Sequence, residues 1–225
     1  MADVISLATL QKIKGIGNKT MEEIKKVLQQ EKEPLQVDFP KKKYNVIYAD
    51  PPWAYDESGT GNRVVHSKYP TMSLNDLKRL PVQDISDDNC LLFLWVTFPR
   101  LEEGLEVINA WGFRYYGLFK TWIKTNKKSD SLFWGMGYYS RQNPEILLIG
   151  LKGKIPPKVR DEHSVLISKV REHSRKPDEV RDQIVRVTGD LPRIELFARQ
   201  QTEGWDVWGN EIDKFEKEND KISLF

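Results

Sequence analysis

The chain has 225 residues, of which 39% are hydrophobic and 30% are charged, so it is long enough for one domain with a small appendage. Its longest apolar run, Leu91 to Val96, is too short to cross a bilayer, and its first residues lack a basic-then-apolar signal pattern. We therefore expect a cytoplasmic protein. The single cysteine, Cys90, excludes an intramolecular disulfide, and together with three histidines it supplies no spaced ligand set, so no metal is expected.

The formal net charge is only +2, but the charge is unevenly distributed. Between Lys152 and Lys176 there are eight Lys or Arg against three Asp or Glu, and between Lys120 and Arg141 there are five against one. Such segregation predicts a basic face. Solvated loops that are rich in lysine would give the same counts.

The first 30 residues contain two apolar-periodic helices joined by a Gly-Ile-Gly turn at Gly15 and Gly17. This segment, residues 1–30, resembles a helix-hairpin-helix motif, whose glycines let backbone N–H groups at the start of the second helix approach a DNA phosphate. The resemblance makes both glycines candidate DNA contacts. A helical pair that packs on the main domain is the alternative. Residues 31–43 are polar, with two prolines and three consecutive lysines, and predict a linker.

The apolar run 44–49 stops abruptly at Asp50-Pro51-Pro52-Trp53. It predicts a buried parallel strand that ends at the carboxyl edge of a sheet, where open α/β sheets place their chemistry. The prolines restrict the backbone, so the Asp50 carboxylate and the following carbonyls project as a rigid set of acceptors. Acceptors beside an aromatic ring suit the methylation of an exocyclic amino group.

The tetrapeptide resembles the catalytic motif of S-adenosylmethionine-dependent N6-adenine methyltransferases of the MT-A70-like family. Six blocks between Tyr44 and Glu211 follow the order of that family. The resemblance implies a Rossmann-like α/β methyltransferase fold over residues 44–212, with a mostly parallel central sheet flanked by helices. Residues 213–225 are left as a C-terminal tail.

The same resemblance makes Asp50, Pro51, Pro52 and Trp53 the catalytic residues. In this hypothesis the adenine stacks on Trp53 and presents its N6 amine to Asp50 and to the Pro51 carbonyl. The methyl donor is S-adenosyl-L-methionine.

The remaining elements follow from apolar periodicity, capping residues and glycines. They are a loop over 54–70 that suits a lid, a helix from Ser73 to about Leu80, a strand over 91–96, a helix over 100–111 stopped by Gly112, strands over 117–123, 144–150 and 165–170, a helix to about Thr188 stopped by Gly189, and a strand over 193–199.

The segment between Asn126 and Asn143 carries exposed-looking aromatics among glycines and cations, including Tyr139 and Arg141. Such a composition suits stacking on splayed-out bases. A loop folded over the sheet with its aromatics buried is the alternative.

The family resemblance assigns further roles. It implies that Lys124 contacts the carboxylate of the methionine moiety and that Arg199 contacts the ribose. The candidate cofactor-binding residues are Asp50, Lys124, Glu195, Arg199, Gln201, Asn210 and Glu211. The candidate substrate-binding residues are Trp53, Tyr69, Tyr139, Arg141, Glu145, His173, Arg175, Lys176, Gly15 and Gly17. For His173 we favour a phosphate contact or a structural hydrogen bond.

The resemblance therefore predicts methylation of adenine N6 in nucleic acid, with DNA favoured over RNA because of the hairpin-like segment. An RNA adenosine methyltransferase and a non-catalytic nucleic-acid-binding subunit remain alternatives, as do a homodimer and a paralogous partner. Association with the nucleoid is expected if the source is prokaryotic or viral. No Gly-x-Gly-x-x-Gly follows a strand, which leaves a nicotinamide site without support.

Overall fold

The computed structural model describes residues 19, 20, 22, 35, 37–54, 71–172, 175–210 and 212. Three predicted features lie outside these residues: the hairpin-like turn with Gly15 and Gly17, the part of the predicted lid that contains Tyr69, and the C-terminal tail.

Seven strands form one sheet in the described part of the chain, in the order β5-β3-β4-β2-β1-β6-β7. They are β1 (Tyr44–Ala49), β2 (Ser86–Thr97), β3 (Arg114–Thr125), β4 (Glu145–Lys152), β5 (Val165–Lys169), β6 (Arg193–Leu196) and β7 (Asp206–Trp208). β1 lies inside the sheet, with β2 and β6 parallel to it on either side. The carboxyl ends of these three strands meet at one edge of the sheet, which we call the carboxyl edge.

The sheet is mixed, which corrects the prediction of a mostly parallel one. β4 pairs antiparallel with both β2 and β3, whereas the other four pairings are parallel. The reason lies in the connection, because a parallel neighbour needs a crossover, usually a helix. Residues 126–144 lead from β3 to β4 as a loop without a helix, so the chain turns back beside the strand it has just left.

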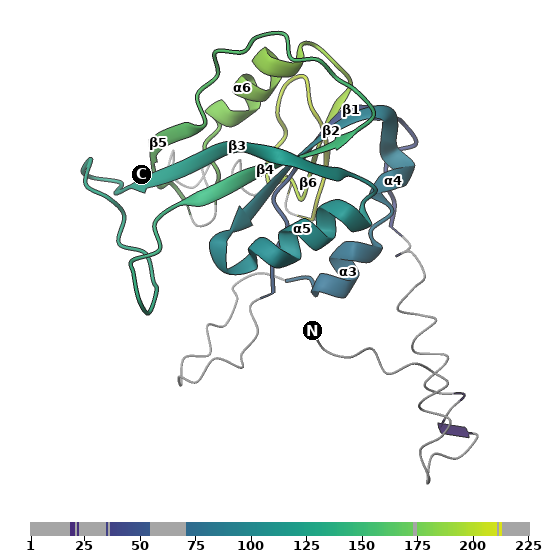
Figure 1. The fold of residues 1–225 in the computed structure, drawn as a ribbon, viewed down its shortest axis with the longest axis horizontal. Helices are drawn as coiled ribbons and strands as arrows, with labels where there is room; N and C mark the ends of the chain where they lie inside the picture. Colours follow the sequence, from purple (N-terminus) through teal and green to yellow (C-terminus); the bar gives the residue numbers. More distant parts are fainter. Residues whose placement is uncertain are drawn as a thin grey trace, which may run out of the picture.

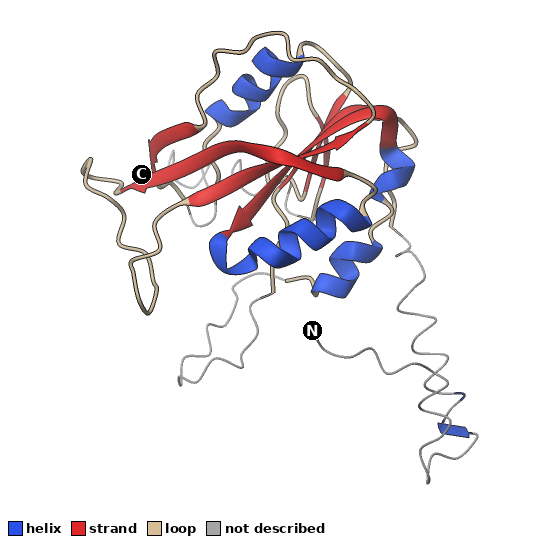
Figure 2. Ribbon diagram, in the orientation of Figure 1, coloured by secondary structure: helices blue, strands red, loops and turns tan. Residues whose placement is uncertain are grey.

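Helices cover both faces of the sheet, as Figures 1 and 2 show. They are α3 (Leu74–Arg79), α4 (Val82–Ile85), the short 3-10 helix η1 (Phe98–Arg100), α5 (Leu101–Ala110) and α6 (Glu179–Thr188). α3 and α5 lie side by side on one face, and α6 lies on the other (Figure 1). This arrangement is that of an α/β methyltransferase fold.

Alternation along the inner strands explains why both faces are covered. Successive strand residues point to opposite faces, so a run that is apolar at every position must be buried on both. In β1, Ile47 belongs to the core cluster that contains Ile108 of α5. Its neighbour Tyr48 belongs to the cluster that contains Ile184 of α6.

Several predicted boundaries are confirmed. The Ser73 hydroxyl accepts from the Asp76 backbone N–H and caps α3 as expected. Gly112 and Gly189 follow α5 and α6 with φ of 81° and 83°, a region that glycine enters without strain. Sequence reasoning missed α4 and β7, and it made β2 and β3 too short.

Candidate active site at the carboxyl edge

The Asp-Pro-Pro-Trp segment forms a tight turn directly after β1. The Trp53 backbone N–H donates to the Pro51 carbonyl at 2.9 Å, and the Met72 N–H donates to the Pro52 carbonyl at 2.9 Å. The turn is therefore held at two points, one internal and one at the start of the segment that leads into α3. Asp50 stands ahead of both prolines, with its side chain 21% exposed.

The Trp53 ring lies in the core. The residue is only 8% exposed, and its indole Nε1 donates to the Trp95 carbonyl of β2 at 3.2 Å. Since a buried indole N–H needs a partner, this bond fixes the ring against the neighbouring strand. The position suits an anchor for the turn better than a platform for a base.

Lys176 reaches Asp50 from the segment that precedes α6. Its ammonium lies 2.8 Å from each carboxylate oxygen of Asp50 and 3.3 Å from Oε2 of Glu145. Glu145, the first residue of β4, also pairs with Lys124 near the end of β3. The structure thus brings four predicted site residues into one chain of ion pairs, Asp50–Lys176–Glu145–Lys124, which we call the ion-pair chain.

The ion-pair chain lies on a layer of aromatic rings. The Lys176 ammonium is 5.6 Å from the ring centroid of Trp95, and that of Lys124 is 5.0 Å from Trp122. Both rings belong to the core cluster beneath α6. Cations over such faces gain favourable electrostatic energy, which helps to offset their desolvation.

The pKa values of the ion-pair chain follow from burial and from opposite charges. Burial alone raises the pKa of Glu145, but Lys176 and Lys124 together hold it below its ordinary value. Burial lowers the pKa of Lys176, yet Asp50 and Glu145 raise it above its ordinary value. Both groups are therefore charged at neutral pH.

Glu195, a predicted cofactor contact on β6, already has a partner. Arg181 of α6 donates to its two carboxylate oxygens at 2.7 and 2.8 Å, and both side chains are almost fully buried. A two-pronged pair of this kind is geometrically specific. It ties α6 to β6 directly behind the active-site edge, a role for Arg181 that the sequence did not indicate.

The end of β6 makes an unusual turn beside Asp50. Phe197 has φ of 61°, the only positive value outside glycine among the described residues. The Ala198 N–H then donates to the Trp208 carbonyl at 3.0 Å, and a Cβ on Gly209 would collide with the Ala198 backbone. Since Leu196 pairs with Ala49, this turn and the following Arg199 emerge next to Asp50.

The remaining predicted cofactor residues lie near this turn or outside the described part of the chain. Gln201 donates through Nε2 to the Trp205 carbonyl at 3.2 Å, and Asn210 is exposed. Glu211 lies outside the described residues, as does His173 among the predicted substrate contacts. Arg175 bonds to Glu172 and Asp178.

The loop over residues 126–144 projects from the carboxyl edge, where β3 ends (Figures 1 and 2). Tyr138 and Tyr139 are 95% and 98% exposed, and Arg141 lies 4.7 Å from the ring centroid of Trp134. The Asn143 amide fixes the base of the loop by donating to the carbonyls of Lys124 and Phe133. The aromatics of this loop are thus presented outward, which decides against the alternative of a buried loop.

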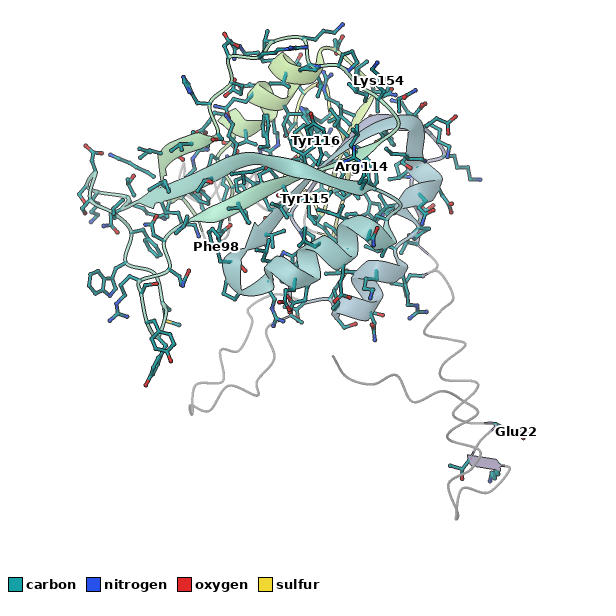
Figure 3. The ribbon with its side chains drawn as sticks, in the orientation of Figure 1. Glu22, Phe98, Arg114, Tyr115, Tyr116 and Lys154 are labelled. Atoms are coloured by element: carbon teal, nitrogen blue, oxygen red, sulfur yellow. The ribbon has the colours of Figure 1, made fainter. Side chains whose placement is uncertain are left out.

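The basic stretch from Lys152 onwards divides between two ends of the sheet. β4 carries the chain away from the carboxyl edge, so Lys152 pairs with Cys90 near the start of β2. Figure 3 shows Lys154 near Arg114 at the start of β3, far from the loop over 126–144. Only the later cations of the stretch, such as Lys176, return to the carboxyl edge.

Two kinds of site were sought without result. The part of the chain that the structure describes contains no group of three His, Cys, Asp or Glu side chains placed to hold a metal ion. None of its helices has the length and apolarity that a membrane crossing requires.

These features define a class. A helix-covered sheet whose inner strand ends in an Asp-Pro-Pro-Trp turn, with the acidic side chain held at the carboxyl edge, is that of an α/β methyltransferase. The model of the MT-A70 family matches residues 44–211, which is the whole described sheet.

Comparison with known proteins agrees. The chain is 36% identical over 193 residues to the type II methyltransferase M.MunI of a Mycoplasma species, covering 77% of this chain and 80% of that protein. It is 32% identical over 178 residues to the human N(6)-adenosine-methyltransferase catalytic subunit METTL3, covering 76% of this chain and 28% of that subunit. The chain belongs to the MT-A70 family of S-adenosylmethionine-dependent N6-adenine methyltransferases.

Proposed function

We propose that the chain methylates the N6 amino group of adenine in DNA and that Asp50 is the acceptor that orients this amine. The observation that carries the proposal is the rigid presentation of Asp50 at the carboxyl edge, between the anchored prolines and Lys176. A carboxylate that accepts an N–H bond from the amine returns electron density to a nitrogen whose lone pair is otherwise delocalised into the base.

The residues at this edge fit S-adenosylmethionine. Its methionine end carries one carboxylate and one ammonium, and the edge offers cations and carboxylates in alternation. In the proposal Lys124 faces the carboxylate, Asp50 faces the ammonium, and Arg199 and Asn210 face the ribose. The cofactor supplies a methyl group on a positively charged sulfur, and the chain's own residues position the amine in line with it.

Asp50 need not remove a proton before the transfer. The methylated amine is acidic enough to lose one afterwards, so orientation and fixed electrostatics supply most of the acceleration. This differs from general base catalysis, in which the acceptor must take the proton in the transition state.

We assign contact with nucleic acid to the loop over residues 126–144. Tyr138 and Tyr139 offer open ring faces on which unstacked bases can lie, and Arg141 adds a cation beside them. Trp53 keeps a place in the mechanism as the anchor of the turn, because its ring is packed in the core.

DNA is favoured over RNA by two observations. The chain covers 80% of the type II methyltransferase, a class that acts on DNA, but only 28% of the human adenosine methyltransferase subunit. The hairpin-like sequence at residues 1–30 also resembles a DNA-binding motif.

A methylation assay on matched double-stranded DNA, single-stranded DNA and RNA oligonucleotides tests this choice. We expect transfer to a DNA strand, located at N6 of adenine by digestion and mass spectrometry. Transfer to RNA alone would establish the RNA alternative. A chain that binds no cofactor in calorimetry and transfers no methyl group would instead be a non-catalytic subunit.

A further inference from the structure

Asp50 and Lys176 form the closest contact of the predicted catalytic carboxylate with any charged group that the structure describes. The ammonium is 2.8 Å from both oxygens, so it sits between them and fixes the rotation of the carboxylate about its Cβ–Cγ bond. An ion pair through a single oxygen would leave that rotation free.

Lys176 is itself held from three directions. Glu145 accepts from it, the Trp95 ring lies beneath it, and Pro177 restricts its backbone to extended geometry. Its side chain is only 10% exposed. Water therefore has little access to the ammonium, and its position depends on these neighbours.

We propose that Lys176 positions Asp50 for methyl transfer and that Glu145 in turn holds Lys176. The inference rests on the proposed function and changes the role of two residues: Lys176 and Glu145 act through Asp50 and need not touch the base. Lys176 is thus a positioning residue.

A carboxylate can serve Lys176 and the adenine amine together. Ionised carboxylates offer about four lone-pair sites. The ammonium takes one on each oxygen, which leaves acceptor capacity on the side that faces the edge. The amine therefore meets a carboxylate whose orientation is already set, with no reorganisation needed during the reaction.

Lys176 also separates two negative charges. Its ammonium lies between the carboxylates of Asp50 and Glu145, both of which it contacts. Without it the two carboxylates share one partly buried site, in which like charges favour the binding of a proton. A protonated carboxyl donates a hydrogen bond instead of accepting one, so the amine loses its acceptor.

Other charged groups surround this site but do not replace Lys176. Lys124 pairs with the far side of Glu145, and Arg181 is committed to Glu195 and Asp178. Tyr48 beneath the site accepts from Trp95 Nε1 at 2.6 Å. None of these groups is recorded in contact with Asp50.

The test compares Lys176→Met with the wild-type chain, using a DNA oligonucleotide that the wild type methylates. We expect kcat to fall about 100-fold at neutral pH, the size of effect that misplacing a reacting group by about 1 Å produces. KM for the oligonucleotide and the calorimetric Kd for S-adenosylmethionine should change far less. Between about pH 6 and pH 9 the kcat of the variant should rise with pH, while the wild-type value stays flat.

Two further variants guard against a folding defect. Lys176→Arg keeps the charge and should recover most of kcat with a flat pH profile. Glu145→Gln leaves Lys176 in place but loosens it, so kcat should fall by a smaller factor. Lys78→Met, which removes an exposed lysine paired with Glu106 on the helical face, is the matched control and should behave as wild type.

Three results would overturn the proposal. They are an unchanged kcat in Lys176→Met, a loss confined to KM or to cofactor affinity, and a kcat whose pH profile stays flat in that variant. A wild-type chain that methylates no adenine would instead refute the proposed function, so the two failures are distinguishable.

Discussion

Single residues at the carboxyl edge carry opposite charges in near balance. Asp50, Glu145 and Glu195 face Lys124, Lys176 and Arg181, and each acid has a cation within hydrogen-bonding distance. The arrangement keeps carboxylates ionised in a partly buried place, which is the state an acceptor needs. None of these pairings follows from local sequence, since Asp50 and Lys176 are 126 positions apart.

Acid should weaken the fold through Glu145. Its folded-state pKa lies below the ordinary value, so its contribution is present above the unfolded pKa of about 4.3 and is lost as pH falls through the folded pKa. Lys176 has the opposite sign: its pKa is raised, so its contribution is lost only when pH rises above about 10.4. Urea unfolding between about pH 3 and pH 7 should show a shallower pH dependence in Glu145→Gln than in the wild type. Equal slopes in the two proteins would show that Glu145 is not held in its charged state by the fold.

Trp53 separates an anchoring role from a stacking role. Trp53→Phe keeps a ring but removes the N–H that bonds to the Trp95 carbonyl, so the free energy of unfolding should fall by about 1–3 kcal/mol. Chemical denaturation measures this loss. If the ring were a platform for the base, stability would be unchanged and KM for the oligonucleotide would rise.

At the scale of elements, α6 is joined to the sheet by more than apolar packing. The buried Arg181–Glu195 pair links its first turn to β6, and Asp178 just ahead of the helix accepts from Arg171, Arg175 and Arg181. These contacts fix the segment from which Lys176 reaches Asp50. The helix is therefore part of the support of the site.

Breaking one side of that pair should be costly. Arg181→Met leaves Glu195 buried without its partner, and the free energy of unfolding should fall by about 3–5 kcal/mol. The double variant Arg181→Met with Glu195→Leu should regain most of the loss, because it buries no unpaired charge. A double variant as unstable as the single one would contradict this account, and a loss of cofactor affinity in a stable Glu195→Leu protein would return Glu195 to the cofactor site.

The loop over 126–144 should affect substrate binding alone. Replacing Tyr138 and Tyr139 by Ala removes two rings that contribute no core packing, so stability and cofactor affinity should stay at wild-type values. KM for the oligonucleotide should rise about tenfold or more, given about 1–3 kcal/mol for each stacked base. An unchanged KM would show that these exposed rings do not contact nucleic acid.

At the scale of the molecule, much of the fold was predictable. Apolar runs identified the inner strands, and Ser73, Gly112 and Gly189 marked helix boundaries because capping and positive φ are local properties. The reversed strand β4 was not predictable from its own residues. Its run Ile146–Gly150 is equally apolar whichever way the strand is paired, and only the missing crossover helix fixes its direction.

The site was predictable in membership but not in arrangement. Resemblance to a family pointed to Asp50, Lys124, Glu145 and Lys176, yet nothing in the sequence indicates that they form one ion-pair chain. Trp53 shows the reverse difficulty, because an aromatic residue in a motif suggests stacking until its burial is known. The basic count between Lys152 and Lys176 also overstated the charge at the carboxyl edge, since β4 carries part of it to the other end of the sheet.

The central claim is that Asp50 is the acceptor for methyl transfer to adenine. The most direct measurement is transfer from labelled S-adenosylmethionine to an adenine-containing DNA oligonucleotide by Asp50→Ala, with cofactor binding followed by calorimetry on the same preparation. We predict that transfer falls below detection while the cofactor still binds with measurable affinity. Transfer at a rate near that of the wild type would contradict the account.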